Sequence, residues 1–244
     1  MSIESLPRAE HATHPIGAIA LALIAAAHVA LTAAPAFHPA KYLDGAPPAL
    51  PPTTVVGGGE VMLEVDVTIG GAVRGVRTLR TTPPYTEALI AATKTWRFAP
   101  AEIEVEPPPP SGQPRFKAVD STVLVAAVFL APALIGPTLG ELPRDVGSES
   151  DSTPFPFATA PPLFPPRARD AGVVMIETMI DTGGQPTANR ILLSSAAFDE
   201  PALAALRQWR FRPARVAGSS TPTLAYVIVG FRQPALAGGP PAPR

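Results

Sequence analysis

The chain has 244 residues, of which 33 are proline and 19 glycine, with 16% charged residues and a formal net charge of −1. This length fits one large or two small domains, and the composition is typical of apolar modules joined by proline-rich connectors. The near-neutral charge gives no electrostatic reason to expect nucleic acid, and the lack of cysteine excludes disulfides and thiol chemistry without assigning a compartment.

Histidine occurs only before residue 40, at His11, His14, His28 and His38. The rest of the chain therefore has no imidazole to serve as a general base or a metal ligand. Serine–histidine hydrolysis and histidine-bound zinc are excluded there, and no acidic cluster with metal spacing takes their place. We predict a protein that is not an enzyme, with no catalytic residue, cofactor or metal ion.

Residues 1–15 form a short polar segment, and residues 16–36 follow without a charged side chain. As a helix, the second segment would span roughly 31 Å, about the hydrocarbon thickness of a bilayer. Its length and the weakly charged leader favour an uncleaved transmembrane anchor, whereas the small residues at 34–36 fit cleavage of a signal peptide. Both alternatives place the rest of the chain outside the cytoplasm. A buried soluble helix is disfavoured because the segment is apolar on all sides.

Three further segments are rich in proline or glycine. Residues 37–58 are predicted to be a linker that would reach roughly 70 Å in an extended, polyproline-like form. Residues 133–162 form a second linker, rich in proline and serine, and residues 233–244 are predicted to be a disordered tail. The chain is thus expected to carry two modules, residues 59–132 and 163–232, on spacers.

The first module opens with alternating apolar and polar side chains, which is typical of a half-buried strand. Gly70-Gly71 is a tight-turn signal that predicts a return strand. An apolar stripe then predicts a helix that ends before Pro100, and a last apolar run predicts a closing strand. The expected elements are strands at 61–69 and 73–80, a helix from Tyr85 or Thr86, and a strand at 122–130.

The same pattern recurs in the second module. Over residues 61–101, an offset of 113, the difference between Val61 and Val174, aligns fifteen identical residues without a gap, which indicates a tandem duplication. We predict an α+β fold of two small strand-strand-helix-strand repeats, each an antiparallel sheet packed on one helix, preceded by an N-terminal hydrophobic helix. The expected elements of the second copy are strands at 173–180, 187–194 and 224–231, and a helix from Asp199, a natural N-cap, to near Arg210.

Each copy ends its helix on the same signature of tryptophan, arginine, phenylalanine and proline. We predict that the aromatic side chains pack in the core where the helix meets the sheet. The arginines are expected to cap the helix C-terminus or to pair locally rather than to bind a partner. These structural signature residues are Trp96, Arg97, Phe98, Pro100, Trp209, Arg210, Phe211 and Pro213.

Both copies resemble the C-terminal domain of the TonB energy-transducer family. The overall plan is similar too, with an inner-membrane helix, a proline-rich periplasmic spacer and a C-terminal domain. Phe164-Pro165 stands where the family has tyrosine-proline. The second copy is the closer match, through Phe164-Pro165, Gly172-Val173-Val174, the turn at 181–184, Ser194-Ser195, Asp199, the Trp209-Arg210-Phe211 cluster with Pro213-Ala214, and a closing strand that ends at Phe231.

The resemblance implies that the last strand pairs with a short extended segment of an outer-membrane active transporter by strand addition. It also implies that the transmembrane helix works with an inner-membrane proton-driven motor, for which His28 is the coupling candidate. Ile24 replaces the family's serine one turn earlier, which weakens the expectation of motor coupling and leaves membrane insertion untouched. The expected partner-binding edge strand comprises Leu224, Ala225, Tyr226, Val227, Ile228 and Val229.

The leading hypothesis is therefore a single-pass inner-membrane protein, with its bulk in the periplasm, that couples the motor to outer-membrane transport. The alternative is an exported structural or scaffolding protein, released into the periplasm after signal cleavage, that uses the modules only for protein association. The sequence leaves open which copy binds the partner, whether the copies pack together, and whether the protein forms a dimer.

Overall fold

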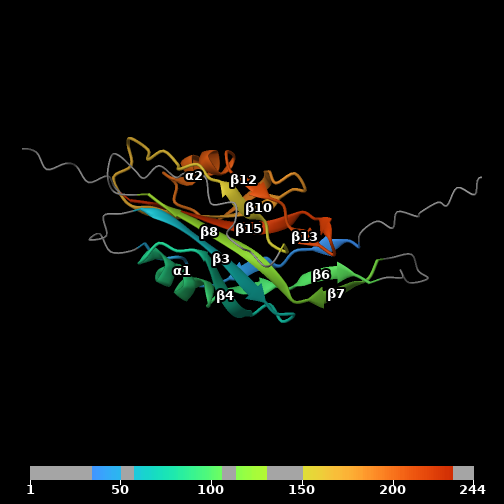
Figure 1. Ribbon diagram of the computed structural model, residues 1–244. Coiled ribbons are helices and arrows are strands. Elements are labelled where there is room, and N and C mark those ends of the chain that lie inside the picture. The colour runs from blue at the N-terminus through green and yellow to red at the C-terminus, as the bar shows by residue number, and fades with distance from the viewer. Residues whose placement is uncertain (1–34, 51–57, 106–113, 131–150, 233–244) are drawn as a thin grey trace, which may run out of the picture. The chain divides into compact units, whose positions relative to one another are not determined.

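The computed structural model describes residues 35–50, 58–105, 114–130 and 151–232 (Figure 1). The predicted N-terminal segment and nearly all of the predicted anchor, including His28, lie outside the described residues, as does the predicted tail. Within the described part of the chain, no helix is long and apolar enough to cross a membrane. We refer to residues 35–130 as the first half and to residues 151–232 as the second half.

Both halves contain two long strands, one helix and a long closing strand, in that order. The α+β class predicted from the sequence is confirmed. In the first half the elements are β3 (Gly59–Val67), β4 (Val73–Arg80), α1 (Tyr85–Thr93) and β8 (Ser121–Phe129). In the second half they are β10 (Gly172–Ile180), β11 (Pro186–Leu193), α2 (Asp199–Leu206) and β15 (Thr223–Phe231). The shorter strands are β1 (Phe37–His38), β2 (Lys41–Asp44), β5 (Arg97–Ala99), β6 (Ala101–Glu104), β7 (Phe116–Val119), β9 (Phe155–Ala158), β12 (Arg210–Arg212), β13 (Arg215–Val216) and β14 (Ser219–Ser220).

The long strands form one six-stranded sheet in the order β11-β10-β15-β8-β3-β4. Neighbours within each half are antiparallel, whereas β15 and β8, the two closing strands, pair in parallel. The expectation of two separate small sheets is therefore corrected. The two halves are continuous through the backbone hydrogen bonds of their closing strands.

The expectation that residues 224–229 form an edge strand is wrong. These residues lie in β15, which has β10 on one side and β8 on the other. Every residue of β15 is buried. Its nearly uninterrupted apolar run is typical of a strand that is covered on both faces, and such a strand belongs in the middle of a sheet.

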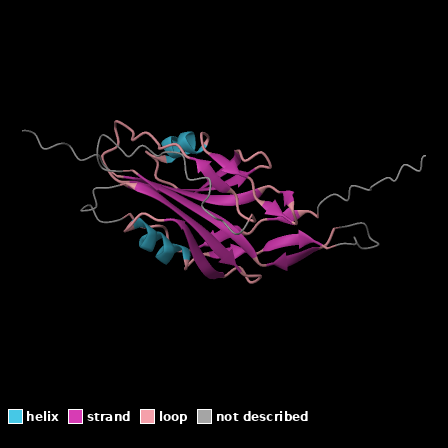
Figure 2. Cartoon of the chain, viewed as in Figure 1, coloured by secondary structure: helices cyan, strands magenta, loops and turns pink. Residues whose placement is uncertain are grey.

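The two helices lie on opposite faces of the sheet (Figures 1 and 2). Leu89 of α1 packs in one core with Tyr226 and Ile228 of β15, whereas Ala202 of α2 packs in the other core with Val227 of the same strand. Alternate residues of a strand point to opposite faces, so the closing strand of the second half contributes to both cores. The closing strands are parallel and the helices lie on opposite faces. This is the arrangement expected if a twofold rotation about an axis parallel to the closing strands relates one half to the other.

Part of each predicted linker is folded onto the sheet. Residues 37–46, here called the first arm, include β1, which pairs with β6, and β2, which pairs with β5. Residues 151–160, the second arm, include β9, which pairs with β12. The linker boundaries at 37–58 and 133–162 are corrected for these residues. Proline-rich composition predicts extended backbone, and extended backbone also suits a strand at the margin of a domain.

The arms are fastened by the signature tryptophans, both only 1% exposed. Trp96 Nε1 donates to the carbonyl of Ala46 at 2.9 Å, and Trp209 Nε1 donates to the carbonyl of Ala160 at 3.1 Å. A buried indole needs a partner for its N–H. Each tryptophan thus fills the core with its rings and holds an arm with its nitrogen.

Each helix begins with a side chain that reaches back to the preceding turn. Asp199 is the first residue of α2, and its carboxylate accepts from the amide of Ser195 at 2.8 Å and from the hydroxyl of Ser194 at 2.6 Å. The expectation that Asp199 is the N-cap is corrected, because it lies inside the helix and satisfies amides outside it. Thr86 Oγ1 plays the same part in α1, where it accepts from the amide of Thr82 at 2.8 Å.

The hairpin turn of each half packs against the strand that follows the helix. Gly184 has a φ of +79°, and its carbonyl accepts from the amide of Phe211 at 2.9 Å. A Cβ at Gly184 would overlap the carbonyl oxygen of Phe211. Gly71 has the same conformation and the same close approach, to Phe98. Both positions therefore require glycine for conformation and for space.

We expect Gly184→Ala to lower the free energy of unfolding by about 3 kcal/mol, because it combines left-handed strain with a clash against backbone. The matched control is Gly183→Ala, whose Cβ would meet only the flexible side chain of Asp181 at 3.3 Å. The control should change stability by less than about 1 kcal/mol. Urea unfolding of both variants checks this, and equal losses would contradict the role given to Gly184.

Candidate functional site

The seam between the halves, defined as the parallel pairing of β8 and β15, fills the position at which a partner strand was expected. Its register runs from Ala225 beside Leu124 to Gly230 beside Phe129. The first half therefore occupies the side of the closing strand opposite β10. The outer strands of the six-stranded sheet are β11 and β4, and within the described ranges no other strand pairs with their outer edges.

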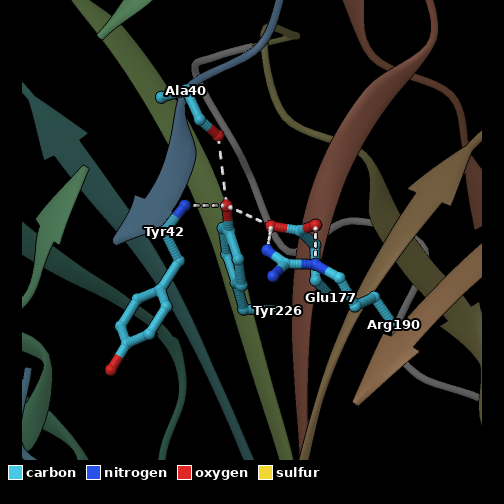
Figure 3. Close-up of polar contacts among 5 residues, drawn as sticks. All are labelled: Ala40, Tyr42, Glu177, Arg190 and Tyr226. Atoms are coloured by element: carbon cyan, nitrogen blue, oxygen red, sulfur yellow. Dashed lines mark hydrogen bonds and ion pairs between the residues drawn. The ribbon is translucent and has the colours of Figure 1, made fainter. Parts of the chain in front are cut away.

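A buried polar cluster lies beside the seam in the second half (Figure 3). Arg190 binds Glu177 with two hydrogen bonds, Nε to Oε1 at 3.0 Å and Nη2 to Oε2 at 3.1 Å. The side chain of Glu177 is 7% exposed and that of Arg190 is 52% exposed, so the arginine brings a solvated charge to a carboxylate under the surface. This two-pronged geometry is the strong form of such a pair.

The Tyr226 hydroxyl connects this cluster to the first arm. It accepts from the amide of Tyr42 at 2.8 Å and donates to the carbonyl of Ala40 at 3.1 Å, and it lies 3.4 Å from Glu177 Oε2 (Figure 3). Burial, and then the negative charge of Glu177, raise the pKa of Tyr226 above its usual range. The phenol therefore stays protonated and binds the arm as a neutral group.

The first half carries the counterpart at the same offset of 113. Arg77 binds Glu64, which is 2% exposed, and Glu64 Oε1 accepts from the hydroxyl of Thr153 in the second arm at 2.6 Å. The second arm also reaches Glu60, through Thr159 at 2.5 Å. The second arm therefore covers buried carboxylates of the first half, and the first arm binds Tyr226 of the second half. The halves are interlocked by arms as well as by the seam.

Residues 160–232 match the model of a family described as Gram-negative bacterial TonB protein C-terminal. This segment belongs to the TonB C-terminal family. No curated protein matches the chain. The TonB C-terminal match begins at Ala160, the residue bound by Trp209, and ends just after β15. It therefore includes the whole sheet contribution of the second half and only the last residue of its arm.

We call the second half, which contains the matched residues 160–232, the TonB C-terminal half. Its signature residues lie around the end of α2. Trp209 and Phe211 are buried and Pro213 is half-buried. The exposed Arg210 donates from Nη1 to the carbonyls of Arg207 and Trp209, at 3.1 and 2.7 Å, so it caps the helix end. In the first half, Trp96 and Phe98 are buried, Pro100 is half-buried and Arg97 is exposed.

The sequence reasoning did not identify the buried pairs of Glu64 with Arg77 and of Glu177 with Arg190. A usable signal was present, because Arg77 and Arg190 are repeated at the same offset as the two glutamates. Among the described residues, no group of three or more histidine, cysteine, aspartate or glutamate side chains is placed to hold a metal ion. What the arrangement offers a partner is backbone at the sheet edges, together with rigid internal polar contacts.

We expect Tyr226→Phe to lower the free energy of unfolding by about 2 kcal/mol at pH 7, because it leaves the amide of Tyr42 without its partner. Hydrogen exchange should speed up at that amide. Tyr42→Phe is the matched control, since it deletes a hydroxyl whose partly buried bond to the carbonyl of Gly45 is 3.2 Å long. The control should cost less than about 1 kcal/mol, and equal effects would contradict the fastening role of Tyr226.

The pH dependence of the same variant tests the burial of the Tyr226 phenol. Its folded pKa is raised, so its stabilising effect is complete below the unfolded pKa of about 10 and declines as the pH rises beyond that value. The stability difference between the wild type and Tyr226→Phe should shrink by about 1 kcal/mol between pH 9 and pH 11. A constant difference in unfolding titrations at these pH values would show that the phenol ionises equally in both states.

Proposed function

We propose that the protein is a periplasmic energy transducer that couples an inner-membrane proton-driven motor to outer-membrane active transporters. The observation that carries the proposal is the TonB C-terminal family match over residues 160–232. It is supported by a fold that presents sheet edges and internal fastenings. Such a fold suits binding and mechanical linkage rather than bond-making chemistry.

We propose further that the first half is a second copy of the TonB C-terminal module. Three matched features support this: the glycine turns at Gly71 and Gly184, the indole bonds of the two tryptophans to the arms, and the buried glutamate–arginine pairs. Matched hydrogen bonds at matched sequence positions are more specific than a shared order of strands and helices. The chain would then hold, in one polypeptide, the arrangement of two associated modules.

The docking edge that best fits this fold is β11. The closing strand is paired on both sides, and a partner could reach it only by breaking the seam and exposing both cores. The strand β11 belongs to the TonB C-terminal half, and its residues 187–190 are exposed. An unpaired strand edge is a template for an extended peptide, with affinity supplied by the main chain. Strand addition by a transporter segment is therefore proposed at β11.

Site-specific disulfide trapping tests this edge, because the natural chain has no cysteine. We expect Ala188→Cys on β11 to form a disulfide with a cysteine-bearing peptide that corresponds to the extended periplasmic segment of a TonB-dependent transporter. Thr78→Cys on β4 and Glu87→Cys on α1 are matched exposed controls, and neither should trap the peptide above background. Preferential trapping on β4 would move the docking edge to the first half. The absence of trapping at either edge would overturn strand addition by this sheet.

The membrane location is proposed from the apolar segment at residues 16–36, which is read from the sequence alone. An anchored transducer should keep residue 1 or 2 as its mature N-terminus and fractionate with the inner membrane. N-terminal sequencing of the purified native protein checks this. A mature protein that begins at residue 37 would remove the anchor and leave a soluble periplasmic protein.

A second candidate function is favoured by the seam itself. Because the two closing strands satisfy one another, the position expected for a transporter segment is filled, as it would be in a scaffolding protein that uses the modules for association alone. The two functions differ in their membrane partner. A transducer should copurify with a motor complex and lose it on His28→Ala, whereas a scaffold should show neither behaviour.

A further inference from the structure

A cavity of about 270 Å³ lies at the end of the sheet where the closing strands β8 and β15 begin. Both halves line it: the first through its first arm and the β6–β7 hairpin, the second through the β13–β14 hairpin and the start of β15. None of the residues that line the cavity belongs to β11. A ligand in the cavity would therefore not compete with strand addition at β11. Its chemistry is independent of the proposed function.

Two hydroxyl groups in the cavity wall are buried and have no hydrogen-bond partner among the described residues. They belong to Thr223, which is 5% exposed, and to Ser121. Leaving a buried hydroxyl without a partner costs about 1–3 kcal/mol, so such groups are rare and call for an explanation. The neighbouring hydroxyl of Thr122 is satisfied by Ser152 at 2.8 Å. The two orphaned hydroxyls therefore lie in the wall beside the cavity, and rotation of either side chain about χ1 would let its hydroxyl bond a polar ligand atom.

The charges around the cavity favour an anion. Asp120 also lines it, but this carboxylate is neutralised by Arg74 at 2.6 Å and accepts from the amide of Ile69 at 2.9 Å. The hydrogen bond from Arg74 lowers the pKa of Asp120. The carboxylate therefore stays ionised and paired with Arg74. Arg215 is exposed and, among the described residues, has no ion pair with a carboxylate. Its guanidinium is the charge at this cavity that is available to a ligand.

The remaining wall is largely apolar, formed by Phe37, Ile103, Val119, Val123 and Leu224. The cavity volume equals that of about nine liquid waters, at roughly 30 Å³ each, which suits a ligand of about ten non-hydrogen atoms. We propose that this cavity binds a small carboxylate with an apolar body. The carboxylate accepts from Thr223 Oγ1 and Arg215, and the body lies against the apolar wall.

The test is calorimetric titration of the full-length protein with octanoate, 1-octanol and octylamine, which share a chain and differ in the head group. We expect saturable binding of octanoate, with octanol and octylamine each at least about tenfold weaker, because a charge-assisted hydrogen bond discriminates by this order. Arg215→Gln and Thr223→Val should each weaken octanoate roughly tenfold. Arg97→Gln removes an exposed arginine away from the cavity and should leave the affinity unchanged.

Thr223→Val tests whether the Thr223 hydroxyl binds the ligand or is only an unsatisfied group in the wall. It keeps the shape of the side chain and removes an unsatisfied group, so it should raise the thermal midpoint of the free protein while it weakens octanoate. Unchanged octanoate affinity in this folded variant would overturn the assignment of Thr223. Equal affinity for the three head groups, or no saturable binding of octanoate, would overturn the carboxylate site itself.

Discussion

The parallel pairing of the closing strands is the interaction on which the rest of the structure depends. A twofold rotation about an axis parallel to these strands places the helices of the two halves on opposite faces of the sheet. Each helix therefore covers a core to which the other half contributes residues. Met175, Tyr226 and Ile228 lie in the core of α1, and Met62 and Leu124 lie in the core of α2. Neither half could keep this apolar surface from water without the other. The hydrophobic gain of folding is therefore shared across the seam.

Local order in this fold could be predicted from the sequence because the signals are local. The alternation at 61–69, the paired glycines and the helix stripe locate β3, the turn and α1 within a few residues. The side of each strand that meets water could not be predicted in the same way. Glu64 and Asp66 alternate with valine and leucine as a solvent face would, yet Glu64 is 2% exposed because the second arm covers it. A contact of high sequence separation leaves no trace in local periodicity.

The closing strand shows a signal that was present and misjudged. Residues 224–229 are apolar without alternation, a pattern that favours a strand buried on both faces. The family resemblance assigned the same residues to an edge, and the two inferences conflict. The structure follows the pattern, since β15 is paired on both sides. The arms were misjudged for a related reason: proline-rich composition restricts φ and favours extended backbone, but it does not determine whether that backbone pairs.

In the proposed function, the arms decide where mechanical load would enter the domain. A pull from the N-terminus reaches the first arm before any other described element, and that arm is paired with β5 and β6 of its own half. The arm is also hydrogen-bonded to Tyr226 in the closing strand of the second half. Load would therefore reach the TonB C-terminal half by two routes, through the seam and directly through Tyr226. Only β10 separates the proposed docking edge β11 from β15, the strand that carries Tyr226. The ion pair of Glu177 on β10 with Arg190 on β11 connects these two strands. The buried polar cluster thus joins the arm to the proposed docking edge through contacts that resist sliding.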